Sequence, residues 1–268
     1  KPIAIFTDGY TYHKNIIGED MAKRMAIIKS GKFYVWSLTW KDIESVFQFQ
    51  GEYYNNYLNP NIIFEGNPQG KQFYTQFINK YNISSLRVHD RNSMKLLLNY
   101  LENPSITEKI KNLVFVYNVC LSYKMATMTH DINTWIDQNY EETGLKISTL
   151  ECYRNQQAFF GSTIIDEEDK QIKILSATNI MDISSNNFEN PFSAIILEDR
   201  DEKIIEDFES VWNGYLNVVN LFQFKENSLF MTTKGIENNL YNEFFVQEDV
   251  ADDINIVAGT NEFWKENI

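Results

Sequence analysis

The chain has little of what marks disordered, secreted or membrane proteins. Its 268 residues include only 11 Gly and 5 Pro, while 43% are hydrophobic and 15% aromatic, so disordered and collagen-like chains are excluded. No stretch approaches the roughly 18 apolar residues that a membrane span requires, and no signal-peptide pattern precedes the first strand-like segment. We therefore expect a soluble globular protein with no membrane partner.

Cysteine is also scarce. Cys120 and Cys152 lie in apolar or aromatic sequence, without CxxC spacing and without a His close by, which favours reduced core thiols and a cytoplasmic location. The chain does not begin with Met and opens directly on core-like sequence. We therefore expect it to be a fragment of a longer protein.

Positive charge is in short supply, and it is unevenly placed. The 24 Lys and Arg are outnumbered by 37 Asp and Glu, for a net charge of -13. Residues 1–50 carry seven basic and five acidic side chains, whereas residues 182–268 carry five and eighteen. Because an acidic surface repels phosphate, this chain is a poor nonspecific ligand of nucleic acid unless its N-terminal face or a metal makes the contact.

The first fifty residues predict strand, helix, strand, helix. Pro2 to Thr7 and Phe33 to Leu38 are apolar runs typical of strands buried on both faces, and Glu19 to Lys29 has helical spacing with acids first and a Gly just beyond. A further helix is expected from Trp40 to about Phe49. Two parallel neighbouring strands joined by the first helix are the simplest packing.

Beyond residue 50 the pattern predicts a mixed helical and stranded region. A short strand is expected at 61–65, helices at 70–81, 93–101, 104–121, 131–142 and 204–222, and a strand at 193–197. An acidic turn at 166–169 between two apolar stretches indicates a hairpin.

The residues most suited to chemistry cluster near the N-terminus. Asp8 ends the first strand, His13 follows five residues later, and Asp20 lies at the start of the helix. Carboxylates and imidazole serve divalent metals and general acid–base catalysis, and open α/β sheets bind ligands at the carboxyl ends of their strands. The alternative is structural: Asp8 caps a turn, His13 meets a loop hydrogen bond and Asp20 caps the helix.

This stretch resembles the very-short-patch-repair endonucleases and their relatives in the PD-(D/E)XK superfamily. The resemblance rests on the string IFTDGYTYH at 5–13, followed by Asp20, Arg24, the Gly31 turn and Val35-Trp36. It implies that Thr7, through its carbonyl, and Asp8 would hold Mg²⁺, that His13 would act near the scissile phosphate, and that Asp20 would orient a histidine. The implied reaction is metal-assisted hydrolysis of a phosphodiester.

Two departures weaken the implied nuclease. The family's main metal-binding Asp lies on a strand before this segment, which the sequence from Lys1 does not include, and Phe6 stands where some relatives have an acid. A site reduced to Asp8 and one carbonyl would bind a metal weakly.

A second resemblance covers most of the chain in scattered blocks. The segments 24–40, LLLNYLENP at 96–104 and WNGYLNVVNLFQF at 212–224 look like the C-terminal region of large bacterial DEAD/DEAH-box helicases, some of them from phage-defence systems. The nearest approach to an ATP site, GNPQGKQ at 66–72, is one residue short of a P-loop and has Gln72 in place of the required Ser or Thr, so ATPase activity is not expected.

Together these patterns predict an α/β protein with a partial PD-(D/E)XK core at 1–50, a mixed α+β extension at 51–190 and an acidic region at 191–268. The leading hypothesis is an accessory module of a helicase-like defence or repair protein that binds DNA together with a helicase portion or partner subunit. The alternatives are a Mg²⁺-dependent DNA endonuclease using Asp8, His13 and Asp20, and a protein-docking domain for a basic partner.

Overall fold

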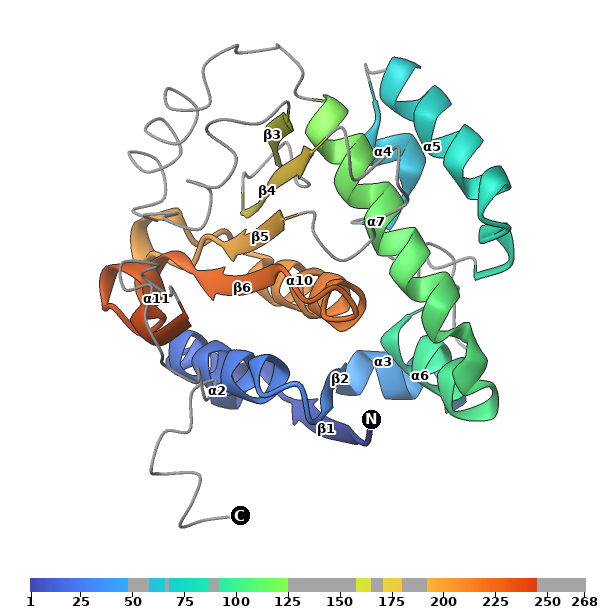
Figure 1. Ribbon diagram of the computed structural model, residues 1–268. Coiled ribbons are helices and arrows are strands. Elements are labelled where there is room, and N and C mark those ends of the chain that lie inside the picture. The colour runs from blue at the N-terminus through green and yellow to red at the C-terminus, as the bar shows by residue number, and fades with distance from the viewer. Residues whose placement is uncertain are drawn as a thin grey trace, which may run out of the picture.

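The computed structural model describes residues 1–47, 58–65, 68–86, 92–124, 158–164, 171–179 and 192–244 (Figure 1). Within these ranges the strands form two sheets: β1 pairs with β2, and β3, β4, β5 and β6 lie side by side in that order. The predicted α/β class is confirmed at this level. The narrower assignment to a PD-(D/E)XK core and the division into three regions stay predictions.

The N-terminal unit has the predicted parallel βαβ arrangement. β1 (Ile3–Asp8) and β2 (Tyr34–Thr39) pair in parallel, with Asp8 opposite Thr39, and α2 (Ile17–Lys29) joins them. α2 ends before Gly31, whose φ of 69° lies in the left-handed region that glycine adopts readily. The helix begins two residues earlier than the sequence predicts, and α3 (Trp40–Phe47) follows β2 directly.

The two strands of this unit differ in burial. β2 is buried along its whole length, as predicted, but β1 is only partly buried and Ile5 is 53% exposed. The prediction that β1 is buried on both faces is therefore wrong. The physical reason is that α2, α3, α6 and α10 all pack on β2, whereas none of the described helices packs as extensively on β1.

The second unit contains the larger sheet. β3 (Ala158–Ile164), β4 (Ile172–Asn179) and β5 (Phe192–Leu197) are antiparallel, as the predicted hairpin requires, and β6 (Ser228–Thr232) lies parallel to β5. The connection from β5 to β6 runs through α10 (Phe208–Phe222), which begins four residues later than predicted. The sequence patterns did not predict β6 or α11 (Thr233–Glu237), which follows it.

The two βαβ units begin their last helices in the same way. The Thr39 hydroxyl accepts the N–H of Asp42 at 3.2 Å, and the Thr232 hydroxyl accepts the N–H of Gly235 at 3.0 Å. Each is a threonine cap at the end of a parallel strand, satisfying a backbone donor that the first turn of a helix leaves free. A threonine N-cap therefore lies at the end of both β2 and β6.

Each unit also covers a strand of the other. α10 packs on β2, and α2 packs on β6 (Figure 1). The Phe230 N–H of β6 donates to Met25 Sδ of α2 at 3.2 Å, and Lys29 Nζ donates to the carbonyl of Glu226 at 2.8 Å. The outer edge of each parallel pair is therefore closed by a helix from far away in the sequence.

The remaining helices flank this pair of units. They are α1 (Tyr10–His13), α4 (Pro60–Ile63), α5 (Pro68–Lys80), α6 (Ser93–Glu102) and α7 (Thr107–Lys124), with short 3₁₀ turns at Ser84–Leu86, Pro104–Ile106, Asp201–Lys203 and Asn242–Phe244. α7 packs against α5, β3 and β4.

One predicted strand is a helix instead. Residues 61–65 were expected to be extended, but Pro60 begins α4, in keeping with the preference of proline for the first position of a helix. Phe64 then packs on Tyr74 of α5 with ring centroids 5.5 Å apart, so tertiary contact overrides the local β preference. The helix predicted at 131–142 lies outside the described residues.

Candidate functional site

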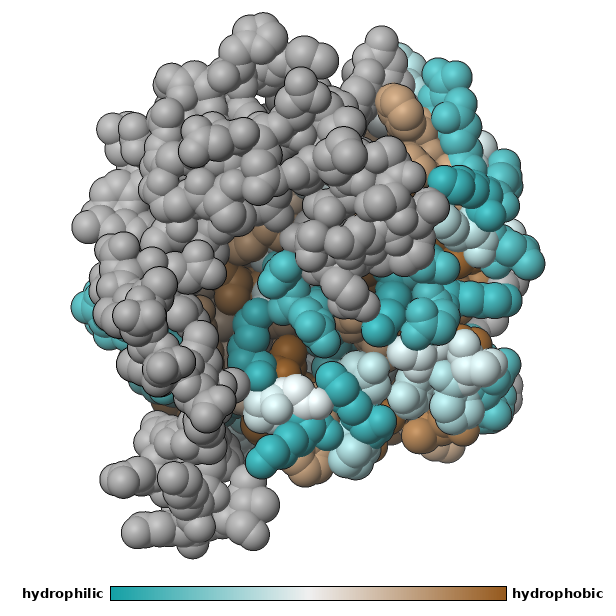
Figure 2. Space-filling model, viewed as in Figure 1, coloured by the Kyte–Doolittle hydropathy of each residue, from teal (hydrophilic) through white to brown (hydrophobic). Residues whose placement is uncertain are grey.

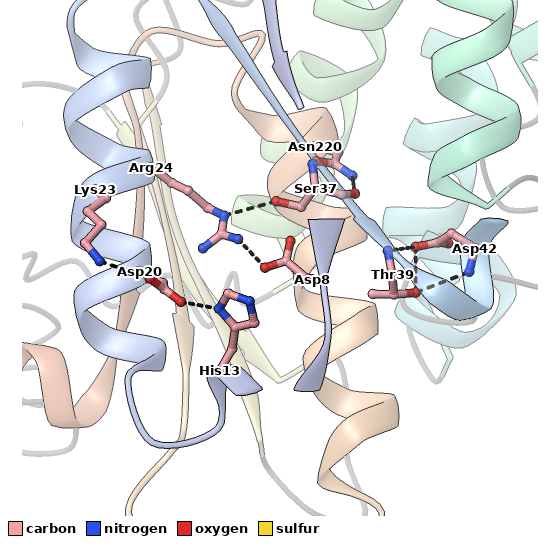
Figure 3. Close-up of polar contacts among 9 residues, drawn as sticks. All are labelled: Asp8, His13, Asp20, Lys23, Arg24, Ser37, Thr39, Asp42 and Asn220. Carbon is pink, nitrogen blue, oxygen red and sulfur yellow. Dashed lines mark hydrogen bonds and ion pairs between the residues drawn. The ribbon is translucent and has the colours of Figure 1, made fainter. Parts of the chain in front are cut away.

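The candidate site lies at the carboxyl ends of β1 and β2. Asp8 is the last residue of β1, and Gly9 leads at once into α1, where the N–H groups of Tyr12 and His13 both bond to the Gly9 carbonyl. This short turn places His13 on the same end of the sheet as Asp8 (Figure 3). α2 then returns past the same edge with Asp20 and Arg24.

Asp8 is engaged by arginine and not by histidine. Its carboxylate forms an ion pair with the Arg24 guanidinium, and the side chains of the pair are 0% and 1% exposed. Arg24 also donates from Nε to the Ser37 hydroxyl at 3.1 Å, with its guanidinium 4.7 Å from the ring centroid of Phe6. These contacts hold Arg24 across the end of the sheet.

The Asp8–Arg24 pair is incompletely satisfied. Asp8 Oδ2 and Arg24 Nη1 are both buried and have no hydrogen-bond partner among the described residues. A buried polar atom without a partner is costly, so such atoms in a native site commonly accompany function or a bound water. The pair therefore has one spare acceptor and one spare donor inside the protein.

His13 and Asp20 come together, as the resemblance implies. His13 Nδ1 contacts the Asp20 carboxylate, and Lys23 Nζ lies 3.3 Å from the other Asp20 oxygen (Figure 3). The His13 side chain is 27% exposed, so its second nitrogen can reach solvent or a ligand in a way that the Asp8 carboxylate cannot. A carboxylate on Nδ1 fixes the orientation of the imidazole ring.

Asp42 is a second buried carboxyl at this edge that the sequence reasoning did not select. It accepts the Thr39 N–H at 3.0 Å and the Thr39 hydroxyl at 2.9 Å, while its own N–H bonds back to that hydroxyl. Burial raises the pKa of the Asp42 carboxyl and the negative charge of Asp8 adds to this, against the hydrogen bonds from Thr39. The pattern Thr39-x-x-Asp42 was a readable capping signature.

A distant helix also supports the site. The Asn220 side chain of α10 accepts the Ser37 N–H at 2.8 Å and donates to the Ser37 carbonyl at 2.8 Å (Figure 3). One turn further along, Gln223 accepts the Val35 N–H at 2.6 Å and donates to the Val35 carbonyl. Two amide side chains thus bond to the free backbone groups of β2 as a neighbouring strand would. No local sequence pattern predicts these contacts.

The predicted Mg²⁺ ligands do not by themselves make up a metal site. Thr7 is exposed, but the charge of the Asp8 carboxylate is already balanced by Arg24 and its side chain is closed to solvent. Across the part of the chain that the structure describes, no three His, Cys, Asp or Glu side chains group as metal ligands. The assignment of Thr7 and Asp8 to Mg²⁺ therefore stays a prediction.

The surface around this edge carries aromatic and basic side chains, which we call the β1–β2 rim: Tyr12, His13, Lys14, Trp40 and Lys41. Tyr12 is 86% and Trp40 51% exposed. Trp40 Nε1 donates to Glu209 at 3.3 Å, and Lys41 Nζ lies 3.7 Å from the same carboxylate. Exposed aromatic rings beside cations suit stacking and charge contacts with nucleic acid.

Comparisons with protein-family models, curated proteins and solved structures found no match to this chain. Among the helices that the structure describes, none is both long and apolar enough to cross a membrane.

Proposed function

We propose that this chain is an accessory module of a helicase-like defence or repair protein and that its β1–β2 rim contacts DNA without cleaving it. The observation that carries the proposal is the burial of Asp8 in an ion pair with Arg24. A carboxylate held in this way has a structural role at the end of β1, because binding a metal through it would leave Arg24 as an uncompensated buried charge.

The rim supplies contacts suited to DNA. Lys14 and Lys41 can approach phosphates, while Tyr12 and Trp40 expose flat rings. Since the whole chain carries a net charge of -13, binding through a broad electrostatic surface is disfavoured. The proposal is therefore a local contact of modest affinity, strengthened by the helicase portion or partner subunit.

The test is DNA binding by the full chain at two salt concentrations, measured by fluorescence anisotropy with labelled single- and double-stranded oligonucleotides. We expect binding that weakens as salt rises and that falls about tenfold in Trp40→Ala, since stacking on one ring contributes about 1–3 kcal/mol. Phe73→Ala is the matched control, because Phe73 is an exposed aromatic on α5. Binding that is absent in the wild type, or equally weakened by both variants, would refute the proposal.

A second candidate, the metal-dependent endonuclease, is favoured by one observation, the contact of His13 with Asp20. An imidazole oriented by a carboxylate can transfer a proton in phosphodiester hydrolysis. Incubating plasmid DNA with the chain in Mg²⁺ or Mn²⁺ separates the two candidates. Cleavage that is lost in His13→Ala but kept in the Phe73→Ala control would establish the nuclease and displace the non-cleaving module.

A further inference from the structure

A cleft that contains none of the rim residues lies between α4, α5, the turn at Ser84–Leu86 and α7. Its cavity volume is about 280 Å³, just below the roughly 300–1,000 Å³ of typical small-molecule sites. Ile83, Leu86 and Leu113 form a floor, each at most 2% exposed. At the upper right of Figure 2, hydrophobic residues lie beside the hydrophilic outer side of α5.

The wall that α5 contributes changes character along the helix axis. Lys71, Thr75 and Ile78 follow one another at helical spacings of four and three residues, so they share one face. Lys71 and Ile78 are separated by about 10 Å along the axis, roughly the length of an extended eight-carbon acid. The cleft is therefore basic at one end and aliphatic at the other.

The charge at the basic end has no oppositely charged partner among the described residues. Lys71 is exposed and forms no ion pair in the described part of the chain. The Thr75 hydroxyl donates to the Lys71 carbonyl at 2.9 Å, so its oxygen can still accept a hydrogen bond at the rim of the cleft. A single cation beside a polar rim matches one monoanionic group.

We propose that this cleft binds an amphipathic small molecule with an aliphatic chain of medium length and one carboxylate. The chain lies on Ile78, Ile83, Leu86 and Leu113, and the carboxylate meets Lys71. The floor of branched aliphatic side chains favours a flexible alkyl body. The site is separate from the β1–β2 rim, so its existence does not depend on the DNA contact.

The first experiment compares three probes with the same alkyl chain, octanoate, 1-octanol and octylamine, by isothermal titration calorimetry of the full chain. We expect octanoate to bind most tightly and octylamine least. Lys71→Gln should weaken octanoate about tenfold and leave 1-octanol unchanged, since it removes a charge-assisted contact and no apolar surface. Lys80→Gln, at the other end of the same helix, is the control and should change neither.

A second variant tests the location of binding. Thr75 is exposed, so Thr75→Trp should fold normally and fill the cleft from its rim, abolishing binding of all three probes while the thermal midpoint stays unchanged. No binding of octanoate, equal binding of octanoate and octylamine, or binding that survives Thr75→Trp would each overturn the proposal.

Discussion

The carboxylate of Asp8 and the guanidinium of Arg24 form an ion pair from which solvent is excluded, joining the end of β1 to the second half of α2. The pair connects through Ser37 to Asn220 of α10, so four elements meet at one buried polar chain (Figure 3). Removing one partner of such a buried pair therefore costs more folding stability than removing both.

Asp8→Ala is therefore expected to destabilise the protein by about 3–5 kcal/mol, because it leaves Arg24 charged, buried and unpaired. Arg24→Met should cost a similar amount, and the double variant should cost clearly less than the sum of the two. Chemical denaturation measures all three. Glu19→Gln, an exposed acid in the first turn of α2, is the control and should change stability by no more than about 0.5 kcal/mol. Strict additivity of the two single changes would show that the pair is not coupled.

The amide contacts of α10 predict a local effect on β2. Gln223→Met keeps the length of the side chain but leaves the Val35 N–H and carbonyl without partners, at a cost of about 1–3 kcal/mol for each buried group. Hydrogen exchange should accelerate most at the Val35 amide. The Trp36 amide is the internal control, because alternate residues of β2 face β1. Equal acceleration at both positions would mean that the substitution acts globally and not on the strand edge.

The threonine at the end of β2 is expected to stabilise α3. Thr39→Ala removes the hydroxyl that bonds to the N–H and carboxylate of Asp42, and should lower stability by about 0.5–2 kcal/mol. Thr39→Ser keeps the hydroxyl and should recover most of the loss. Thermal unfolding of both variants checks this, and an equal loss in the two would point to the missing methyl group and not to the cap.

Lys29 predicts a pH dependence of stability. Burial lowers the pKa of its ammonium group to about 8, against the raising effect of Glu226. Between pH 8 and the ordinary lysine value the unfolded chain binds the proton more readily than the folded chain, so this group makes folding more favourable as the pH rises. The thermal midpoint of Lys29→Met, relative to wild type, should therefore fall between pH 7 and pH 10. An unchanged difference would contradict a lowered pKa at Lys29.

Glu209 is expected to restrain DNA binding at the β1–β2 rim. Its carboxylate accepts a hydrogen bond from the Trp40 indole and lies beside Lys41, so Glu209→Gln should release Lys41 and remove a charge that repels phosphate, while the amide oxygen still accepts from Trp40. We expect affinity to rise several-fold at low salt and the gain to shrink at higher salt. Glu102→Gln on α6 is the control. A decrease in affinity in Glu209→Gln alone would mean that the carboxylate positions Lys41 productively.

Local sequence patterns were sufficient to predict most of the individual elements. Apolar runs placed β1 and β2, helical spacing placed α2, α6 and α10, and the strand-turn-strand pattern placed the hairpin of β3 and β4, because each depends on residues close together in the chain. The order Asp8, Gly9, His13, Asp20 likewise sufficed to expect a polar cluster at the end of β1. The contact of His13 with Asp20 spans only seven residues, and the resemblance implied that Asp20 would orient a histidine.

The contacts that these side chains make depend on how the elements pack together, which local patterns do not reveal. Asp8 and His13 are five residues apart, yet Asp8 contacts Arg24 inside the protein and His13 contacts Asp20 nearer the surface, since the first is the buried last residue of β1 and the second lies in the short helix beyond it. The closing of β2 by Asn220 and Gln223 spans more than 180 residues. The spacing of Asn and Gln residues in a sequence does not predict which groups their side chains contact. The backbone groups that they satisfy become unpaired only when β2 is left at the edge of a small sheet.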